Sequence, residues 1–401
     1  MNRCDGDSDP LPLAGTRVLD LSSRVGAYCG KVLADLGADV LKVERPGGDQ
    51  LRRTPPFAPA SDGGEQGLLF AWYHNNKRGI TLDWTHSDAV ALLAELAAPA
   101  DVVVVSPDVR EPLAGFEDPP SRPAWLPQHT TLCAITPYGV TGPWRHWRAT
   151  PFTSFAASGQ MHATGPDEGP PLAMPGQQLF DQASTRAATM VISTIASRFT
   201  GQTIDVSAHE VGAWQYQVIQ RFATSGRILS RATNFGPPPG GIWQCRNGYV
   251  DIAAHSVHHW EVFVKLLGSP EELQDPMYSE RAMRVALFDL LTTFITAHMA
   301  NQSAQEFVDR GQALGLPCTV QYRPDEYLQD DHPWARGAFV QVENPALGQV
   351  TMPGPVVTTA PPLATYRLPA PVLGASNKEV YVDELGHSPG ELDDWRERGL
   401  I

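Results

Sequence analysis

Asp181 is the acidic residue whose place in the sequence is best suited to chemistry. It begins the alanine-rich stretch DQASTRAATMVISTIAS (residues 181–197), whose composition predicts a helix. An aspartate at the start of a helix is typically an N-cap, which accepts hydrogen bonds from free backbone N–H groups. The same N–H groups favour an anion and can donate to a developing oxyanion, so a capping role and a catalytic role are compatible.

Histidines and cysteines are the other side chains with chemical potential. His255 and His259 face the same way only on a helix, and since no third ligand is evident we predict no metal site. The five cysteines are odd in number, lie far apart and include no C-x-x-C pair. This pattern fits neither a disulfide framework nor a structural zinc site, and it favours a reducing, cytoplasmic location.

The first third of the chain must supply the framework that positions such residues. Residues 16–21 and 38–44 read as strands, and residues 25–36 between them have helical spacing, which makes a β-α-β unit. The pattern continues with expected strands at 79–82, 101–105 and 132–136 and a helix at 87–96. These elements predict an α/β fold with a parallel sheet.

The middle of the chain predicts a separate, smaller domain. After the alanine-rich helix we expect a strand at 203–206, a second helix over about 210–224 and a loop at 234–241. A strand at 249–253 and helices at 259–267 and 286–299 follow. From about residue 339 the sequence is proline-rich, with two expected strands at 339–342 and 348–352 and a short acidic helix at the end.

Composition restricts the partners. The chain has 401 residues and a formal charge of −14, so a large basic face for nucleic acid is excluded and an anionic ligand needs a local basic pocket. Hydrophobic residues make up 42% of the chain, but no uninterrupted apolar stretch approaches the ~18–20 residues of a membrane span. We therefore expect a globular protein with neither a nucleic-acid nor a membrane partner.

Nine segments in order resemble the class III CoA-transferases, the CaiB/BaiF family, and the resemblance covers about residues 12–401. The segments are LAGTRVLDL (13–21), LADLGADVLKVERPGG (33–48), NNKRGITLD (75–83), ADVVV (100–104), YGVTGP (138–143), GQTIDVS (201–207), NGYVD (247–251), GLPC (315–318) and LGASNKEV (373–380).

The resemblance implies a fold that the periodicity alone does not give. It is a large Rossmann-like domain built from both chain ends together with a smaller α+β domain, and two chains interlock as rings in a homodimer. On this chain the large domain would span residues 12–224, the small domain 225–330, and residues 331–401 would return to the large domain.

The resemblance also implies a chemistry, in which coenzyme A passes from an acyl-CoA to a carboxylic acid and no cofactor is held permanently. Such a transfer needs a nucleophile that is also a good leaving group, and a carboxylate is both. The family position of this nucleophile falls on Asp181. The matching positions for binding coenzyme A are Arg45 and Lys77, with the backbone of Val25 and Ala27, and Arg148 is a further basic candidate ahead of the aspartate.

Gly240 and Gly241 lie where described transferases carry a glycine-rich loop that closes over the aspartyl thioester, because water would hydrolyse it. Three prolines precede them at 237–239 and predict a stiffer gate. The chain also departs from the family at Phe180 and Thr185, where glycine is usual, and we expect narrower access for the sulfur of coenzyme A.

Other functions within the same fold remain open. An α-methylacyl-CoA racemase needs two opposed acid/base groups, one of them a histidine after the Gly-Pro motif, but this chain has Thr150 at the matching site and His146 about four residues early. An isomerase that shifts coenzyme A within one diacid and a catalytically silent CoA-binding subunit are the remaining alternatives.

Overall fold

The computed structural model describes residues 11–60, 63–106, 122–166, 168–215, 218–228, 231, 236–355 and 357–401. The chain divides into two compact units. The larger comprises residues 1–161, 173–219 and 331–401, and the smaller comprises residues 162–172 and 220–330. The smaller unit thus includes residues 162–172, and its main part begins at residue 220, compared with the expected start at 225.

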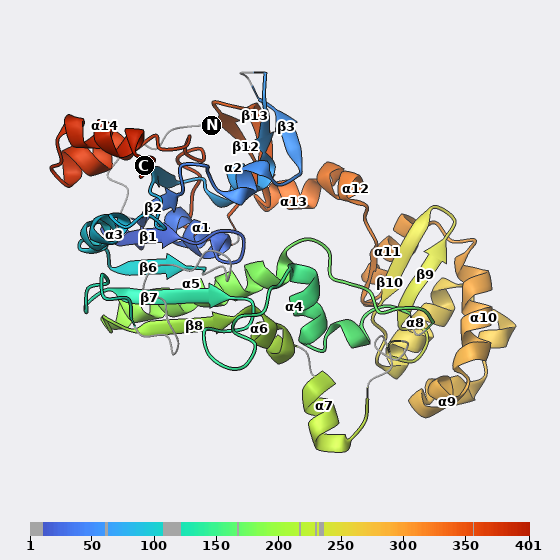
Figure 1. The fold of residues 1–401 in the computed structure, drawn as a ribbon. Coiled ribbons are helices and arrows are strands. Elements are labelled where there is room, and N and C mark those ends of the chain that lie inside the picture. Colours follow the sequence, from blue (N-terminus) through green and yellow to red (C-terminus); the bar gives the residue numbers. More distant parts are fainter. Residues whose placement is uncertain are drawn as a thin grey trace. The chain divides into compact units, whose positions relative to one another are not determined.

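The larger unit is built on a six-stranded sheet in the order β5-β2-β1-β6-β7-β8, in which every pairing is parallel (Figure 1). Its strands are β1 (Arg17–Leu21), β2 (Asp39–Glu44), β5 (Lys77–Thr81), β6 (Val102–Val105), β7 (Thr131–Thr136) and β8 (Thr203–Ser207). This order reverses direction between β1 and β6, which is the doubly wound arrangement of Rossmann folds. The predicted α/β fold with a parallel sheet is confirmed.

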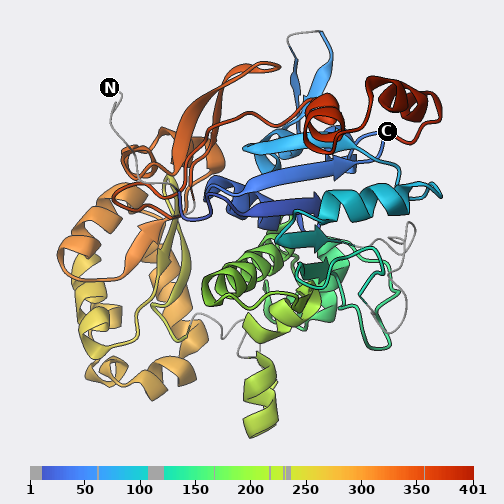
Figure 2. The same ribbon diagram turned by 90° about the vertical axis from the view of Figure 1, so that its left-hand side faces the viewer.

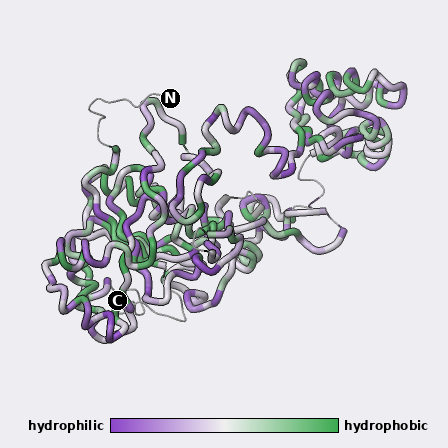
Figure 3. The backbone as a smooth tube through the Cα atoms, turned by 90° about the horizontal axis from the view of Figure 1, so that it is seen from above, coloured by the Kyte–Doolittle hydropathy of each residue, from purple (hydrophilic) through white to green (hydrophobic). Residues whose placement is uncertain are grey.

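Alternate residues of the strands enter two separate cores, because both faces of the sheet are covered. Val18 and Val40 pack under α1 (Ala27–Asp35) and α5 (Gln178–Ser197). Leu19 and Leu41 face the opposite side, against α3 (Ala89–Ala97) and the C-terminal helices η5 (Lys378–Glu384) and α14 (Pro389–Glu397). In Figure 3 the hydrophobic stretches of this unit accordingly gather in its interior.

Both ends of the chain contribute to the larger unit. Figure 2 shows the red C-terminal segment beside the blue N-terminal strands. The backbone N–H of Asp83 donates to the carbonyl of Leu400 (2.6 Å), and that of Thr81 donates to Asn377 Oδ1 (2.8 Å). Asn76, with a positive φ of 61°, binds the returning segment at Thr365 and Leu368. The NNKR motif therefore holds the two chain ends together.

Shorter elements complete this unit. They are η1 (Gln50–Arg53), the hairpin β3 (Phe57–Pro59) and β4 (Glu65–Gly67), α2 (Leu68–Tyr73), α4 (Pro151–Ala157), α6 (Ala208–Gln215), α13 (Asp331–Ala335) and the hairpin β12 (Phe339–Asn344) and β13 (Gly348–Pro353).

The smaller unit packs helices on an antiparallel three-stranded sheet in the order β11-β10-β9. Its strands are β9 (Gly241–Cys245), β10 (Gly248–Ile252) and β11 (Cys318–Val320), and its main helices are α8 (Val257–Leu266), α9 (Arg281–Ala286), α10 (Phe288–Met299), α11 (Ala304–Ala313) and α12 (Pro324–Gln329). In place of the expected helix over 210–224 the structure has α6 and α7 (Val218–Ser225). None of the helices in the described ranges combines the length and the apolar character of a membrane span.

Candidate active site

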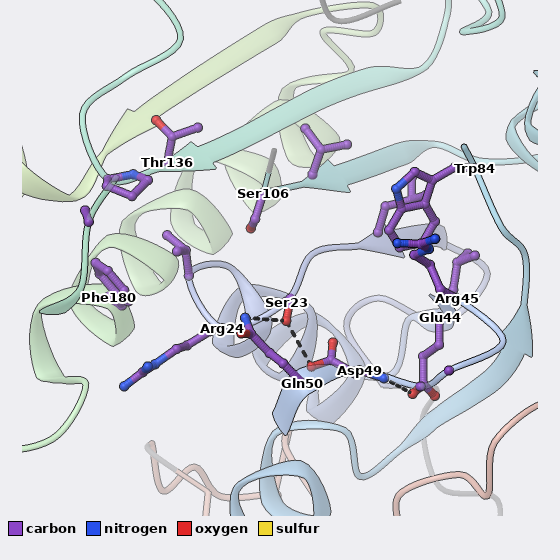
Figure 4. Close-up of a pocket in the computed structure, with 18 of the residues that line it drawn as sticks. Ser23, Arg24, Glu44, Arg45, Asp49, Gln50, Trp84, Ser106, Thr136 and Phe180 are labelled. Carbon is purple, nitrogen blue, oxygen red and sulfur yellow. Dashed lines mark hydrogen bonds between the residues drawn. The ribbon is translucent and has the colours of Figure 1, made fainter. Parts of the chain in front are cut away.

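A cavity of about 990 Å³ lies at the carboxyl ends of the parallel strands, where Leu21, Glu44, Val105 and Thr136 line it (Figure 4). This is the edge at which open α/β sheets bind ligands, and the strand order reverses here. The lining includes five arginines, at positions 24, 45, 53, 145 and 148. The acidic chain thus assembles the local basic pocket that an anionic ligand requires.

The turn after β2 is fixed by buried charges. Glu44 accepts two hydrogen bonds of 2.7 Å from the Arg52 guanidinium and one of 2.9 Å from the backbone N–H of Asp49. The Asp49 carboxylate in turn pairs with Lys42 (3.1 Å) and accepts from Ser23 Oγ (2.9 Å). Because these groups satisfy one another, the loop that carries Arg45 has a defined shape.

Asp181 lies in the first turn of α5, and it is not among the residues that line the cavity, although Phe180 directly before it is. The helix begins at Gln178 with Gln177 as its N-cap, so the expectation that Asp181 begins and caps this helix is wrong. Its side chain instead accepts a hydrogen bond of 2.8 Å from the hydroxyl of Tyr73, at the end of α2. The neighbouring Phe180 lines the cavity and is 2% exposed.

Burial gives Asp181 an unusual titration. Partial removal from water raises the pKa of its carboxyl from 3.8 to about 6, although the hydrogen bond from Tyr73 lowers it. No lysine or arginine among the described residues forms an ion pair with it, unlike the fully buried Asp20, which pairs with Lys77. Burial and the Asp181 charge raise the pKa of Tyr28 to about 12 and that of Tyr73 still further. Among the described residues, the Asp181 carboxylate is therefore stabilised by a neutral phenol and by no counter-ion.

Arg45 lines the cavity at the end of β2 and pairs with Asp83 (3.2 Å). Burial raises the pKa of the Asp83 carboxyl, but hydrogen bonds from Thr85 and Arg45 outweigh it and hold that pKa below its usual value. The Arg45 side chain is 34% exposed and lines the cavity, so a ligand phosphate can reach it. Its role in binding coenzyme A remains a prediction.

Lys77, which the resemblance suggests as a coenzyme A-binding residue, lies in the interior of the larger unit. It is fully buried, and its ammonium group contacts Asp20 (2.8 Å), His74 (3.1 Å) and the carbonyl of Ala27 (3.3 Å). Neither Lys77 nor Ala27 lines the cavity, whereas Val25 does. The geometry thus gives Lys77 an internal ion pair that holds β5, β1 and α1 together.

The remaining candidates are Arg148 and the two glycines of the expected gate. Arg148 is an exposed residue of the cavity lining. Gly240 and Gly241 belong to the smaller unit, where the N–H of Gly240 donates to the carbonyl of Pro237 (3.0 Å) and Trp243 Nε1 anchors Pro239 (2.8 Å). Residues 234 and 235 of the expected loop lie outside the described residues.

Two side chains near Asp181, those of Tyr73 and Arg24, were not predicted from the sequence. Tyr73 ends the run GLLFAWY, whose apolar character is typical of core residues, and nothing in that run marks its hydroxyl as functional. Arg24 follows β1, lines the cavity and donates from Nε to Gln177 Oε1 (2.6 Å). A charged residue directly after the first strand of a parallel sheet was the signal that could have identified it.

Comparison with known proteins identifies the family of this chain. Residues 13–377 match the sequence profile of CoA-transferase family III. The chain belongs to this family. Mouse succinyl-CoA:glutarate CoA-transferase is 28% identical over 418 residues, which cover 100% of this chain and 92% of that enzyme. The formyl-CoA:oxalate CoA-transferase of Streptomyces coelicolor is 28% identical over 425 residues, covering 97% of this chain and 99% of its own.

A third relative is longer than this chain. The probable CoA-transferase Rv1866 of Mycobacterium tuberculosis is 31% identical over 383 residues, which are 91% of this chain and 47% of that protein, so this family III chain spans about half its length. Among solved structures, a CaiB/BaiF family protein from Brucella suis superposes with a TM-score of 0.78 at 23% identity, covering 94% of this chain and 100% of that one. This likeness shows the shared fold.

Proposed function

We propose that this chain transfers coenzyme A from an acyl-CoA to a carboxylic acid, with Asp181 as the covalent nucleophile. The observation that carries the proposal is the Asp181 carboxylate, which is partly buried, hydrogen-bonded to Tyr73 and without a counter-ion among the described residues. Phe180, its neighbour in α5, lines the arginine-rich cavity. Membership of the family and relatives named for succinyl-CoA and formyl-CoA transfer support the same reaction.

The proposed steps conserve the energy of the thioester. The Asp181 carboxylate attacks the acyl carbon, the C–S bond breaks, and the coenzyme A thiolate leaves a mixed anhydride behind. The thiolate then attacks the Asp181 acyl carbon, which releases the first carboxylate and forms an aspartyl-CoA thioester. The acceptor carboxylate repeats the two steps in reverse.

The raised pKa of Asp181 suits this role. Above pH 6 the carboxylate is ionised, yet its partial burial leaves it less solvated than an exposed aspartate and hence more reactive. The Tyr73 hydroxyl, 2.8 Å away, can transfer its hydrogen bond to the carbonyl oxygen on which negative charge develops during attack. Thr185, a departure from the family, donates its hydroxyl to the Asp181 backbone carbonyl (2.8 Å).

The racemase alternative is less well supported. Thr150 lines the cavity and caps α4, with its hydroxyl bound to the backbone N–H of Thr153. His146 is exposed, and no histidine is present among the described residues of the cavity lining. The described part of the cavity lining therefore offers no histidine for the pair of acid/base groups that proton exchange at the α-carbon requires.

The finer features implied by the resemblance belong to the same proposal. They are a homodimer of interlocked rings, a gate at Gly240 and Gly241, and the absence of a permanently bound cofactor. The stiff, buried turn at Pro237–Pro239 supports a gate that moves as a unit with β9 rather than a freely mobile loop.

Intact-protein mass spectrometry tests the nucleophile. After incubation with an acyl-CoA, hydroxylamine should convert Asp181 to a hydroxamate, and Asp181→Asn should abolish this adduct. Asp205→Asn is the matched control, because burial also raises the pKa of Asp205 but its partner is the backbone N–H of Val140 and not a tyrosine hydroxyl. Absence of any adduct on the wild type with every acyl-CoA tried, despite binding of coenzyme A, would favour the silent-subunit alternative.

A further inference from the structure

Arg24, which lines the cavity, forms a polar pair with Gln177, one helical turn before Asp181. Arg24 lies between β1 and α1, and its Nε donates to Gln177 Oε1 over 2.6 Å. Gln177 is the N-cap of α5, and its carbonyl accepts from the backbone N–H of Asp181 (3.0 Å). The pair is thus attached directly to the helical turn that carries the proposed nucleophile.

Several donors of this pair have no partner. Because a guanidinium can only donate, the amide oxygen of Gln177 must face Arg24, and its Nε2 points elsewhere. That Nε2 is buried without a hydrogen-bond partner among the described residues, and Gln177 as a whole is 8% exposed. Neither Nη group of Arg24 makes a hydrogen bond within the described ranges. An unsatisfied buried amide destabilises the folded protein, and a ligand that accepts these hydrogen bonds would remove that cost.

We propose that Arg24 and Gln177 bind a second, non-reacting carboxylate of the substrate, so that the enzyme prefers dicarboxylic acids and their mono-thioesters. The proposal rests on the transferase function proposed above and names the substrate class of that site. A guanidinium with two free Nη groups matches the two oxygens of a carboxylate, and the amide Nε2 supplies a further donor.

The charge of the reacting carboxylate argues for this assignment. The reacting group is an anion as the free acid but neutral in the anhydride and in the thioester, so a fixed cation on it would slow attack on the aspartyl thioester. A remote carboxylate stays negative throughout, and a fixed cation suits it in every step. Consistent with this, Arg24 forms no ion pair with Asp181, yet its charge reaches Tyr73 and opposes the rise in the pKa of that phenol.

The phosphates of coenzyme A are a less fitting partner for Arg24. Figure 4 shows Arg24 and Arg45 at opposite ends of the cavity lining, with Arg24 on the side of Phe180 and Arg45 beside Trp84. Arg45 and its end of the cavity suit the nucleotide, whereas Phe180 directly precedes the proposed nucleophile in α5. We therefore assign the acyl group, and not the nucleotide, to the end of the cavity that carries Arg24.

Paired thioesters of equal chain length test the proposal. Wild-type protein is mixed with succinyl-CoA or butyryl-CoA, and the rate of formation of the Asp181–CoA thioester is followed by intact mass. We expect succinyl-CoA to react about 10- to 100-fold faster, since hydrogen bonds to a charged group contribute about 1.5–3 kcal/mol. Arg24→Met should remove this preference by slowing succinyl-CoA alone, and Arg24→Lys, which keeps the charge, should restore part of it.

Gln177→Met provides a second variant in case Arg24→Met does not fold, and it should also reduce the ratio of the two rates. Equal rates with the two thioesters in the wild type would overturn the dicarboxylate proposal and leave the transferase function intact. An equal loss with both thioesters in Arg24→Met or in Gln177→Met would also overturn it. Absence of an aspartyl adduct with every thioester would instead refute the transferase function itself.

Discussion

Replacing Asp181 by asparagine should make the protein more stable while it abolishes activity. The pKa of this carboxyl rises from 3.8 to about 6 on folding, a shift of about 2 units, and each unit corresponds to 1.36 kcal/mol. Keeping Asp181 ionised in the folded protein therefore costs about 3 kcal/mol at pH 8. Asparagine has nearly the same shape, can still accept from Tyr73 and carries no charge, so Asp181→Asn escapes this cost.

The size of the effect depends on pH. Because the pKa is higher in the folded state, the folded wild type binds a proton more tightly than the unfolded chain and gains stability as the pH falls below 6. The advantage of Asp181→Asn should thus be about 3 kcal/mol at pH 8, shrink between pH 6 and pH 4, and vanish at lower pH.

Asp20→Asn is the matched comparison, with the opposite sign. Asp20 is also a buried aspartate, but Lys77 and Lys42 outweigh the effect of burial and lower its pKa. Its replacement leaves Lys77 buried without a counter-ion and should destabilise the protein by about 3–5 kcal/mol.

Urea denaturation of the wild type and both variants at pH 5 and pH 8 gives the free energies of unfolding. A gain for Asp181→Asn that is the same at both pH values, or no gain at pH 8, would refute the argument from desolvation.

Other substitutions test the remaining parts of the site. Tyr73→Phe removes the hydrogen bond that lowers the pKa of Asp181, so the acidic limb of the pH–rate profile should move above pH 6, and an unchanged limb would contradict the contact. Arg45→Gln should weaken coenzyme A binding about tenfold in calorimetry without lowering the melting temperature, since its pair with Asp83 is partly exposed. Lys77→Met should instead lower the melting temperature strongly, and a variant that melted normally would disprove its structural role. Gly30→Ala should destabilise by about 1–3 kcal/mol in urea, because the added methyl would overlap the Asp20 carboxylate.

The strands of the larger unit could be predicted from sequence because both faces of the sheet are buried. The run VVVV of β6 is apolar at every position, because its side chains enter the cores on both faces of the sheet. A strand covered on one face only would alternate apolar and polar residues. The ends of helices were harder to place. Helix α5 begins three residues before Asp181, since the positive φ of Gly176 ends the preceding turn and Gln177 takes the capping position.

The site could be predicted only in part. Asp181 and Arg45 were predicted from the resemblance to a family. Tyr73 contacts Asp181 and Arg24 contacts Gln177, and the two residues of each pair are more than 100 positions apart in the sequence. No local pattern encodes such contacts. Lys77 illustrates the converse problem, because a lysine in a loop-like motif reads as exposed until the fold places Asp20 beside it.

The return of residues 331–401 to the larger unit sets the order in which the protein can fold during synthesis. Val380, Tyr381 and Leu400 belong to the core between the sheet and α3, so that core stays incomplete until residue 401 has left the ribosome. The smaller unit, whose core lies within residues 243–318, can fold first. Until residues 380–401 pack against the sheet, one apolar face of β1, β2 and β6 stays exposed and can bind chaperones. Expression at reduced temperature should therefore raise the soluble yield, because it slows aggregation at this stage.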